Sequence, residues 1–454
     1  MYENFLDIDE ELSPLLVGRD PALSHRGDHQ RLLQMHRKHV AARRGNGDVP
    51  AVGPLLMKRI TDARTMYEGI VQLRRRGASP GPGKLRLEVL DEYERWSLSR
   101  ALAKSVRDGT YRPGRESQVK IPKEGKPGKF RTLTVQPIVD RIVAKAAKLI
   151  LEPCVDPGFF PFTFGFRPRR GCTEALATAL TLARTQGRWV WVSADIAQAF
   201  DRIPPRRLLD ACRLHFPDDV VAFISVVART GKRRGIRQGS PLSPLLFNIF
   251  AGHFIDRPCH RDHPDVPLIR YADDLLVTCS NVDEAHQLYE RLSALAMSAG
   301  VPLKGSIDTS IFDLRGGQSL EWLGVRLQRT GSLLSIRIGD LAWERLRWRF
   351  AKAHLLPASP IRAVQIIRGW LGFMGPCYLF ENRDAVLSRV HEIALEFAFD
   401  ELPPKTELMQ IWSAAYARWV RLARRQVDLL PSRLHAIHER HYVGGEAAVV
   451  ADCV

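Results

Sequence analysis

Apolar and polar positions recur with two different periods along this 454-residue chain. Apolar residues have helical spacing in residues 57–76 and again in LDEYERWSLSRALAKSVRDG, and GASPGPGK between them predicts a break. VKIPK and FRTLTV predict two strands joined by the turn EGKPG, and IVDRIVAKAAKLILEP predicts a long helix. The first third of the chain therefore predicts helices around one hairpin.

The pattern changes further along the chain. RWVWVSA is an apolar strand that ends at Asp195, residues 244–257 have helical spacing, and residues 268–279 predict a hairpin. After residue 330 the pattern is one of basic amphipathic helices, such as DLAWERLRWRFAKAHL and AAYARWVRLARRQVDLL. Mixed strands and helices followed by helices alone predict an α+β fold with a helical appendage.

Asp273 and Asp274 stand side by side in the hairpin LIRYADDLLVT. They are either a polar hairpin tip or part of a metal site, because a divalent cation makes clustered carboxylates favourable. Asp195 alone would be a helix cap, but beside this hairpin it would complete a set of three carboxylates. Such oxygen donors suit Mg²⁺, and two ions about 3.5–4 Å apart can stabilise both oxygens of a phosphoryl transfer.

Charge and composition narrow the function. The chain has 67 Lys and Arg against 50 Asp and Glu, a net charge of +17, and no long apolar run. This balance predicts a nucleic-acid partner rather than a membrane. The N-terminus does not resemble a signal peptide, and seven scattered cysteines without CxxC spacing favour a reducing, cytoplasmic location.

Two local segments are open to more than one interpretation. Cys259, His260 and His263 in RPCHRDH form a loose candidate zinc cluster, but no second ligand pair follows, so a solvated loop is preferred. In RQGSPLSPLLFNIF, Ser243 is the expected N-cap and Pro244 the expected first residue of a helix. That local explanation leaves the adjacent loop free for function.

At this point the motifs resemble a known family. SADIAQAFD, RQGSPLSPLLFN and RYADD are similar, in order and spacing, to three palm motifs of reverse transcriptases. VKIPKEGKPGKFRTLTV, PIVDRIVAKAAKLILEP and FTFGFRPRRGCTEAL resemble the fingers motifs of the group II intron-encoded branch, and RGWLGF resembles its thumb motif. The resemblance covers roughly residues 60–375 and implies a right-hand polymerase fold.

The resemblance also implies a domain division. The expected parts are a basic N-terminal extension (1–58), fingers with the start of the palm (59–187), a palm with an antiparallel sheet and the catalytic motifs (188–330), and an α-helical thumb or maturase-like C-terminal region (331–454). The chain shows no HNH-like pattern or Cys pairs, so we expect no endonuclease domain.

By the same resemblance, Asp195, Asp273 and Asp274 are the expected catalytic carboxylates. The implied metal set is Asp195, Ile196, Asp273 and Asp274, holding two Mg²⁺ ions for which Mn²⁺ is a possible substitute. A primer 3′-hydroxyl would attack the α-phosphate of a deoxynucleotide and release pyrophosphate, which is chemistry of positioning and charge stabilisation.

The resemblance assigns further residues to nucleotide and nucleic acid. Phe200 is the expected steric gate against a ribose 2′-hydroxyl, with an aromatic core residue as the alternative. The expected nucleotide-binding residues are Lys123, Arg131, Phe200, Gln238 and Gly239. The expected template or primer contacts are Arg167, Arg169, Tyr271 and Ala272, with surface ion pairs as the alternative for the two arginines.

Two motifs depart from the family pattern. Many relatives have Lys-Thr where this chain has Asp308 and Thr309, so Lys304, a water or no group at all would serve as the proton donor to pyrophosphate. The segment GASPGPGK also lacks the usual Asp-Gly, which puts the contacts of the fingers entry in doubt.

The resulting hypothesis is an RNA-directed DNA polymerase whose partners are an RNA template, a DNA or RNA primer and deoxynucleotides. One alternative is an intron maturase, an RNA-binding splicing cofactor. The other is a domesticated reverse transcriptase in antiphage defence, CRISPR adaptation or DNA repair, with a host or defence protein as a possible partner. The sequence leaves the natural template and primer, the oligomeric state and the role of residues 1–58 open.

Overall fold

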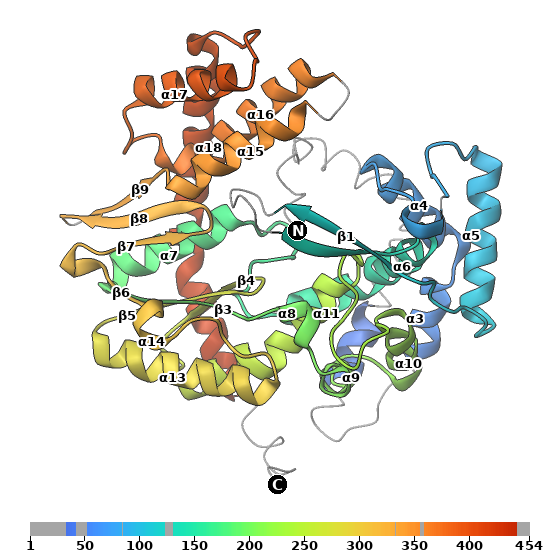
Figure 1. Ribbon diagram of the computed structural model, residues 1–454. Coiled ribbons are helices and arrows are strands. Elements are labelled where there is room, and N and C mark those ends of the chain that lie inside the picture. Colours follow the sequence, from blue (N-terminus) through green and yellow to red (C-terminus); the bar gives the residue numbers. More distant parts are fainter. Residues whose placement is uncertain are drawn as a thin grey trace.

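The computed structural model describes residues 33–41, 52–83, 85–122, 130–331, 333–354 and 358–442. Figure 1 shows a central sheet, a group of helices with a hairpin to one side of it, and a second helical group above it. The mixture of antiparallel sheets and helices confirms the predicted α+β class. In the part of the chain described, no helix combines the length and the apolar character needed to cross a bilayer.

The first group contains several helices and the predicted hairpin. Its elements are α3 (Gly53–Ile60), α4 (Ala63–Arg75), η4 (Gly81–Gly83), α5 (Glu92–Arg107), β1 (Ser117–Pro122), β2 (Phe130–Val135), α6 (Ile138–Val155) and η5 (Asp156–Gly158). The helix predicted at 57–76 is two helices, because the side chain of Asp62 accepts a hydrogen bond from the Arg64 N–H and starts α4. A short helix at residues 33–41 places His36 Nε2 2.8 Å from the His215 carbonyl oxygen.

The central sheet is antiparallel with strand order β4-β5-β3-β6. Its strands are β3 (Val190–Asp195), β4 (Leu268–Tyr271), β5 (Asp274–Cys279) and β6 (Ile311–Asp313). The surrounding helices are α7 (Cys172–Gln186), α8 (Ala199–Arg202), α9 (Pro205–Arg213), α10 (Asp218–Val227), α13 (Val282–Ala299), α14 (Ile307–Ser310) and η7 (Leu314–Gly316). Figure 1 shows α7 above the sheet and α13 below it, which explains why the strands are apolar on both faces.

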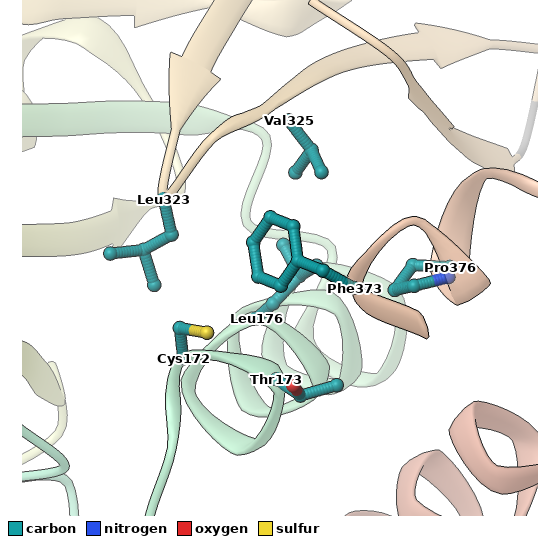
Figure 2. A pocket seen from close by; sticks show the side chains of 7 residues that line it. All are labelled: Cys172, Thr173, Leu176, Leu323, Val325, Phe373 and Pro376. Carbon is teal, nitrogen blue, oxygen red and sulfur yellow. The ribbon is translucent and has the colours of Figure 1, made fainter. Parts of the chain in front are cut away.

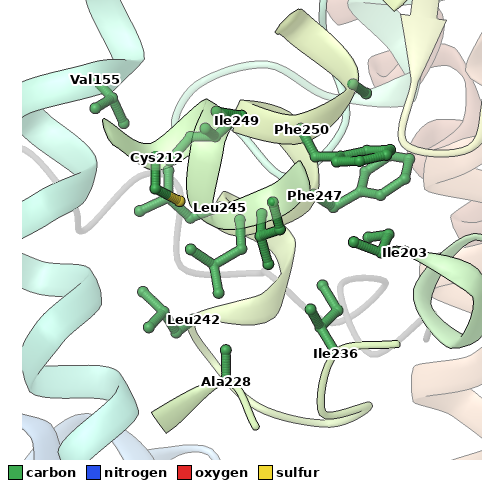
Figure 3. Close-up of a cluster of buried hydrophobic side chains, with 14 of the residues drawn as sticks. Val155, Ile203, Cys212, Ala228, Ile236, Leu242, Leu245, Phe247, Ile249 and Phe250 are labelled. Carbon is green, nitrogen blue, oxygen red and sulfur yellow. The ribbon is translucent and has the colours of Figure 1, made fainter. Parts of the chain in front are cut away.

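One long helical run packs against α9 and α13. It consists of α11 (Ser243–Ala251), the π-helix η6 (Gly252–Asp256) and α12 (Arg257–Asp262). Ser243 is the first helical residue rather than the N-cap, and its hydroxyl donates to the Arg237 carbonyl at 2.6 Å. In Figure 3, Leu245 and Phe247 of this run lie in one cluster of buried apolar side chains with Ile203 and Ile236, which makes the run part of the larger core.

The prediction of a solvated loop at residues 259–263 is wrong. Cys259 and His260 lie in α12 and are buried, and the His260 ring stacks on Phe160 at a centroid distance of 4.7 Å. The described residues contain no group of three or more His, Cys, Asp or Glu side chains arranged to hold a metal ion, so the zinc alternative has no cage here. The motif is better explained by apolar packing of a thiol and an imidazole.

The helical appendage begins after a second small sheet. β7 (Ser319–Trp322), β8 (Val325–Thr330) and β9 (Leu333–Arg337) precede α15 (Asp340–Ala353), α16 (Ser359–Phe373), η8 (Gly375–Cys377), α17 (Arg383–Glu396) and α18 (Lys405–Tyr442). The expected boundary between 330 and 331 falls in the β8–β9 turn. Helix α18 returns along α7, where Arg433 Nη1 donates to Thr178 Oγ1 at 3.0 Å.

The appendage and the central sheet share a core. Trp191 of β3 is fully buried in the same apolar cluster as Trp370 and Trp412 of the appendage. Figure 2 shows a pocket at this junction, lined by Cys172, Thr173, Leu176, Leu323, Val325, Phe373 and Pro376. Its lining is almost wholly apolar, so the pocket is a packing defect between two layers rather than a site for charged ligands.

Candidate active site

The register of the central sheet brings the three predicted carboxylates together. Asp195, the last residue of β3, lies opposite Asp274, the first residue of β5. Tyr271 of β4 lies opposite Asp274 on the other side, so Ala272 and Asp273 form the turn between the strands. The Ile196 N–H donates to the Asp273 carbonyl oxygen at 3.0 Å and ties the turn to the end of β3.

The carboxylates repel one another at this edge. Burial, a hydrogen bond with Asp195 and the neighbouring negative charges together raise the pKa of Asp274 to about 9. Burial, with the charge of Asp195 adding to it, also raises the pKa of Asp273. Both shifts mean that the site resists carrying its full negative charge without a cation nearby.

The cation that the chain itself supplies is Lys304. Its Nζ lies 2.8 Å from Asp195 Oδ2, and its backbone N–H donates to the Asp195 carbonyl at 2.7 Å. Burial lowers the pKa of Lys304, but the hydrogen bond to Asp195 and the three carboxylate charges outweigh it and the net shift is upward. With side chains 50% and 44% exposed, the pair adds little stability, so its interest is electrostatic.

The residues present fit a divalent cation. Three carboxylates are hard oxygen donors, and Ile196, whose side chain is buried, can add only its main-chain carbonyl. No three acidic, His or Cys side chains among the described residues already converge on one point, and the Lys304 ammonium stands beside Asp195 instead. An ion at this edge would therefore compete with that ammonium for Asp195.

Phe200 lies in α8 just beyond Asp195. The residue is 6% exposed, and its ring stacks on Phe247 at 5.3 Å between centroids and meets Phe166 edge-on at 6.0 Å. Most of the ring surface is thus in the core, as the alternative interpretation expected. The gate assignment depends on the small fraction that remains exposed.

The loop before α11 lies against the hairpin β1–β2. Gly239 has a φ of +76°, and a Cβ there would lie 3.1 Å from the Thr134 carbonyl oxygen, so glycine is needed for both reasons. Gln238 Nε2 donates to Asp201 Oδ2 at 2.6 Å. The neighbouring Arg237 is buried and donates to Asp140 at 2.9 Å, which fixes the loop to the start of α6.

The predicted hairpin contacts are described only in part. Arg131 lies on β2 opposite Ile121. Lys123 lies outside the described residues. Both assignments remain predictions.

The two fingers arginines differ. Arg167 is 8% exposed, and its guanidinium donates to the Asp156 carboxylate at 2.7 Å and to the carbonyl oxygens of Phe160 and Thr163, both at 3.0 Å. This corrects the expected template contact, because these donors point into the protein and brace its own loop. Arg169 is exposed with a φ of +56°, so the template contact remains a prediction for that residue alone.

Sequence reasoning missed the residues beneath the turn. Arg270, Asp256 and Asn248 are buried and joined by side-chain hydrogen bonds of 2.8–2.9 Å. The available signal was a charged residue in the otherwise apolar strand LIRY, where burial demands a partner. Asp308, in contrast, is an exposed residue in the first turn of α14.

Comparison with known proteins identifies the central part of the chain. Residues 121–326 match the family model described as reverse transcriptase (RNA-dependent DNA polymerase). Protein YkfC of Escherichia coli (strain K12) is 30% identical over 217 residues, which are 44% of this chain and 55% of YkfC. The group II intron-encoded protein LtrA of Lactococcus lactis subsp. cremoris is 32% identical over 168 residues, 34% of this chain and 27% of LtrA.

A more distant relative is the RNA-directed DNA polymerase from mobile element jockey of Drosophila melanogaster, 28% identical over 174 residues, which are 33% of this chain and 19% of that protein. The chain thus spans about half the length of YkfC and smaller parts of the other two. The matched region contains every strand of the central sheet and all three carboxylates. Residues 121–326 are therefore similar to reverse transcriptases, and part of the chain is similar to a group II intron-encoded protein.

Proposed function

We propose that the chain is an RNA-directed DNA polymerase that adds deoxynucleotides to a primer 3′-hydroxyl on an RNA template. The observation that carries this proposal is the register that pairs Asp195 with Asp274, next to Asp273, inside a reverse transcriptase domain. Three neighbouring carboxylates, two of them with raised pKa values, are unfavourable unless a cation balances their charge. A role in folding alone therefore explains them poorly, whereas binding of divalent cations explains them well.

The proposed cofactor is a pair of Mg²⁺ ions, with Mn²⁺ as a substitute, held by the three aspartates and the Ile196 carbonyl. Bound there, the metal would supply charge stabilisation for the attacking 3′-oxygen and for the leaving pyrophosphate. The protein's own contribution is positioning, because paired strands hold the carboxylates at fixed separations before substrate arrives. Lys304 and water are the two candidates for the proton that pyrophosphate takes up.

The nucleotide and nucleic-acid assignments follow the motif positions. We assign Lys123 and Arg131 to the triphosphate, and Gln238 with Gly239 to the nascent base pair. We assign Phe200 to the selection of deoxyribose. We assign Tyr271 and Ala272 to the primer end and Arg169 to the template backbone, where a guanidinium binds phosphate without reading sequence.

Primer extension tests the polymerase proposal. The purified protein, an RNA template, an annealed DNA primer, deoxynucleotides and Mg²⁺ should yield a full-length DNA product. Asp273→Ala should abolish it, whereas Asp283→Ala, an exposed aspartate in the first turn of α13, should leave it unchanged. Full activity of Asp273→Ala would refute the assignment of the site.

A second function is favoured by one comparison. The similarity to a group II intron-encoded protein and the net charge of +17 support binding to a structured intron RNA as a maturase. The two roles are compatible, because a maturase would bind RNA through exposed cations, whereas DNA synthesis would use the carboxylates.

The six described cysteines are free thiols, which supports the predicted cytoplasmic location.

Crosslinking of RNA and DNA to the protein in its native cell separates these biological roles. Recovery of one structured intron transcript would support the maturase, and splicing of that transcript should then depend on the protein. Recovery of assorted cellular or phage transcripts would support a domesticated enzyme in defence, CRISPR adaptation or repair.

A further inference from the structure

Arg270 is the single charged residue of strand β4 and is fully buried, with a relative exposure of 0%. A guanidinium keeps its charge at any physiological pH, so its burial is costly unless its donors are paired. Arg270 Nε and Nη2 donate to Asp256 Oδ1 and Oδ2, each at 2.8 Å. Asp256 is 2% exposed, so this two-point ion pair is closed to solvent.

The remaining nitrogen of Arg270 reaches the catalytic turn. Nη1 donates to the Ala272 carbonyl oxygen at 3.2 Å and to Asn248 Oδ1 at 2.9 Å. Ala272 has a φ of +56°, a left-handed conformation that is unfavourable for a residue with a Cβ. The turn therefore needs its surroundings to hold it, and a buried, paired guanidinium is a rigid group for that purpose.

The partners of the guanidinium are themselves fixed. Asp256 is the last residue of the π-helix η6, a local change of helical register of the kind that recurs at functional sites. Its Oδ2 also accepts a hydrogen bond from Thr163 Oγ1 at 2.9 Å. Asn248 donates Nδ2 to the Gly165 carbonyl at 2.9 Å. The network thus joins α11 and η6 to the segment that leads into α7.

That segment also touches the turn directly. The Phe164 N–H donates to the Arg270 carbonyl at 2.8 Å, and the Arg270 N–H donates to the Phe162 carbonyl at 3.0 Å. A Cβ on Gly165 would lie 2.1 Å from the Ala272 nitrogen, so the two backbones are in closest contact. The turn consequently has no free space beneath it into which it could relax.

We propose that Arg270 is a positioning residue, which orients Asp273 of the turn and the adjacent Asp274 by holding the Ala272 carbonyl, while Asp256 and Asn248 fix its guanidinium. Nothing in this role requires Arg270 to touch substrate. The inference rests on the proposed function for what Asp273 and Asp274 bind. The inference adds that a buried charge, Arg270, sets the orientation of these two aspartate side chains.

Arg270→Lys is the direct test, with Arg188→Lys as the matched control. Arg188 braces the same sheet at its other end, through Glu284 at 3.2 Å and the Thr278 carbonyl at 3.3 Å. Lysine keeps the charge but loses the planar fork, so it cannot hold Asp256 and the turn together. The measurements are kcat and KM for primer extension, the Mn²⁺ dissociation constant by electron paramagnetic resonance, and the melting temperature.

We expect Arg270→Lys to lower kcat and to weaken Mn²⁺ binding, each by about 10- to 100-fold, at temperatures where circular dichroism shows it fully folded. KM for the nucleotide should hardly change. Arg188→Lys should lower only the melting temperature. Thr163→Val, which removes one hydrogen bond from Asp256, should also lower kcat and Mn²⁺ affinity, but by less than Arg270→Lys. This variant replaces Arg270→Lys as the test if the lysine variant does not fold.

Two results would overturn the inference. One is a folded Arg270→Lys or Thr163→Val protein with kcat and Mn²⁺ affinity within about twofold of the wild type, well short of the loss that removing an orienting residue causes. The other is an equal loss in Arg188→Lys. If the wild type itself fails to extend a primer, the proposed function fails, and the Mn²⁺ measurement still tests the positioning role.

Discussion

The two ends of the central sheet use the same strands for different purposes. At one end Asp195 lies opposite Asp274, and at the other Val190 lies opposite Cys279 and Asp313. Val190 and Cys279 are fully buried apolar side chains, as expected where a sheet closes against its covering helices. The catalytic end instead places like charges in register, which cross-strand pairing normally avoids.

Charge balance separates the two ends most clearly. At the far end each acid has its own base, since Asp313 Oδ2 lies 2.8 Å from Arg315 Nη2 and Glu284 Oε1 lies 3.2 Å from Arg188 Nη1. At the catalytic end three carboxylates share the exposed Lys304, because the buried Arg270 is already paired with Asp256. Folding alone accounts for the far end, whereas under the proposed function a bound cation would balance the excess of negative charge at the end that carries the three aspartates.

The largest expected effect comes from removing one carboxylate at each end. Asp195→Asn should lower primer extension by about 1000-fold or more, because metal stabilisation of the transition state is worth several kcal/mol and each 1.36 kcal/mol is tenfold. Asp313→Asn should leave activity unchanged and cost at most about 1 kcal/mol of stability, since its partner is exposed. Single-turnover extension and chemical denaturation measure both. Equal activity of the two variants would contradict the comparison.

A methyl group beneath the turn should have the next largest effect. Gly165→Ala would force a Cβ to within 2.1 Å of the Ala272 nitrogen, so the turn must move. A displacement of about 1 Å at reacting groups costs roughly 100-fold in rate, and overpacking costs about 1–3 kcal/mol.

Gly316→Ala is the control at the far end, because a Cβ there meets nothing within 4 Å. Activity should be normal for this variant, and thermal melts should place its stability near that of the wild type. A Gly165→Ala protein with wild-type kcat would show that the turn tolerates displacement.

Much of this contrast was predictable from the sequence. The run RWVWVSAD predicts a buried strand that ends in an acid, and the hairpin around Asp273 and Asp274 is predicted by its apolar, β-prone flanks, so the meeting of three carboxylates follows from antiparallel pairing. The break at Asp62 and the helix at residues 257–262 were not predicted. A short polar residue within a helical pattern is ambiguous, and a Cys-His-rich segment does not reveal that it is buried.

The charged residue in the apolar strand LIRY could have indicated that Arg270 is buried, but local pattern could not have identified its partners. Asp256 and Thr163 lie outside that strand, and each alone is typical of a solvated position. Only the tertiary structure shows that all three are buried together. Arg167 illustrates the converse error, because a basic motif next to a site predicts phosphate binding, whereas its donors are used within its own loop.

The pH dependence of stability should distinguish the two ends in the absence of metal. The pKa of Asp274 is raised from its usual value to about 9 in the folded protein, chiefly by burial. Between about pH 4 and that value the folded state holds a proton that the unfolded chain has released, so stability falls as pH rises. Low pKa values of His36 and His253 act in the opposite sense below about pH 6.5, so the informative quantity is a difference between variants.

The melting temperature of the wild type in chelator should therefore drop more between about pH 7 and 9 than that of Asp274→Asn. Saturating Mg²⁺ should remove most of the drop, because it stabilises the ionised pair. The hydrogen bond with Arg315 lowers the pKa of Asp313 in the wild type, so this residue does not titrate in this range. The melting temperature of Asp313→Asn should therefore change with pH as that of the wild type does. Parallel curves for wild type and Asp274→Asn would mean that the pKa of Asp274 is not raised in the folded protein.

The smallest expected effect concerns the exposed cations of the two ends. Lys304 and Arg315 each lie 2.8 Å from an aspartate oxygen and are similarly exposed. Under the proposed function, Lys304 would compete with a metal ion for its aspartate, whereas Arg315 would not. Lys304→Met should tighten Mn²⁺ binding by up to about fivefold, since an exposed pair is worth no more than about 1 kcal/mol. Arg315→Met should leave Mn²⁺ binding unchanged. If Lys304→Met also lowers kcat with saturating metal, Lys304 delivers the proton to pyrophosphate; if kcat is unchanged, water does, and the lysine serves only to balance Asp195 until the metal binds.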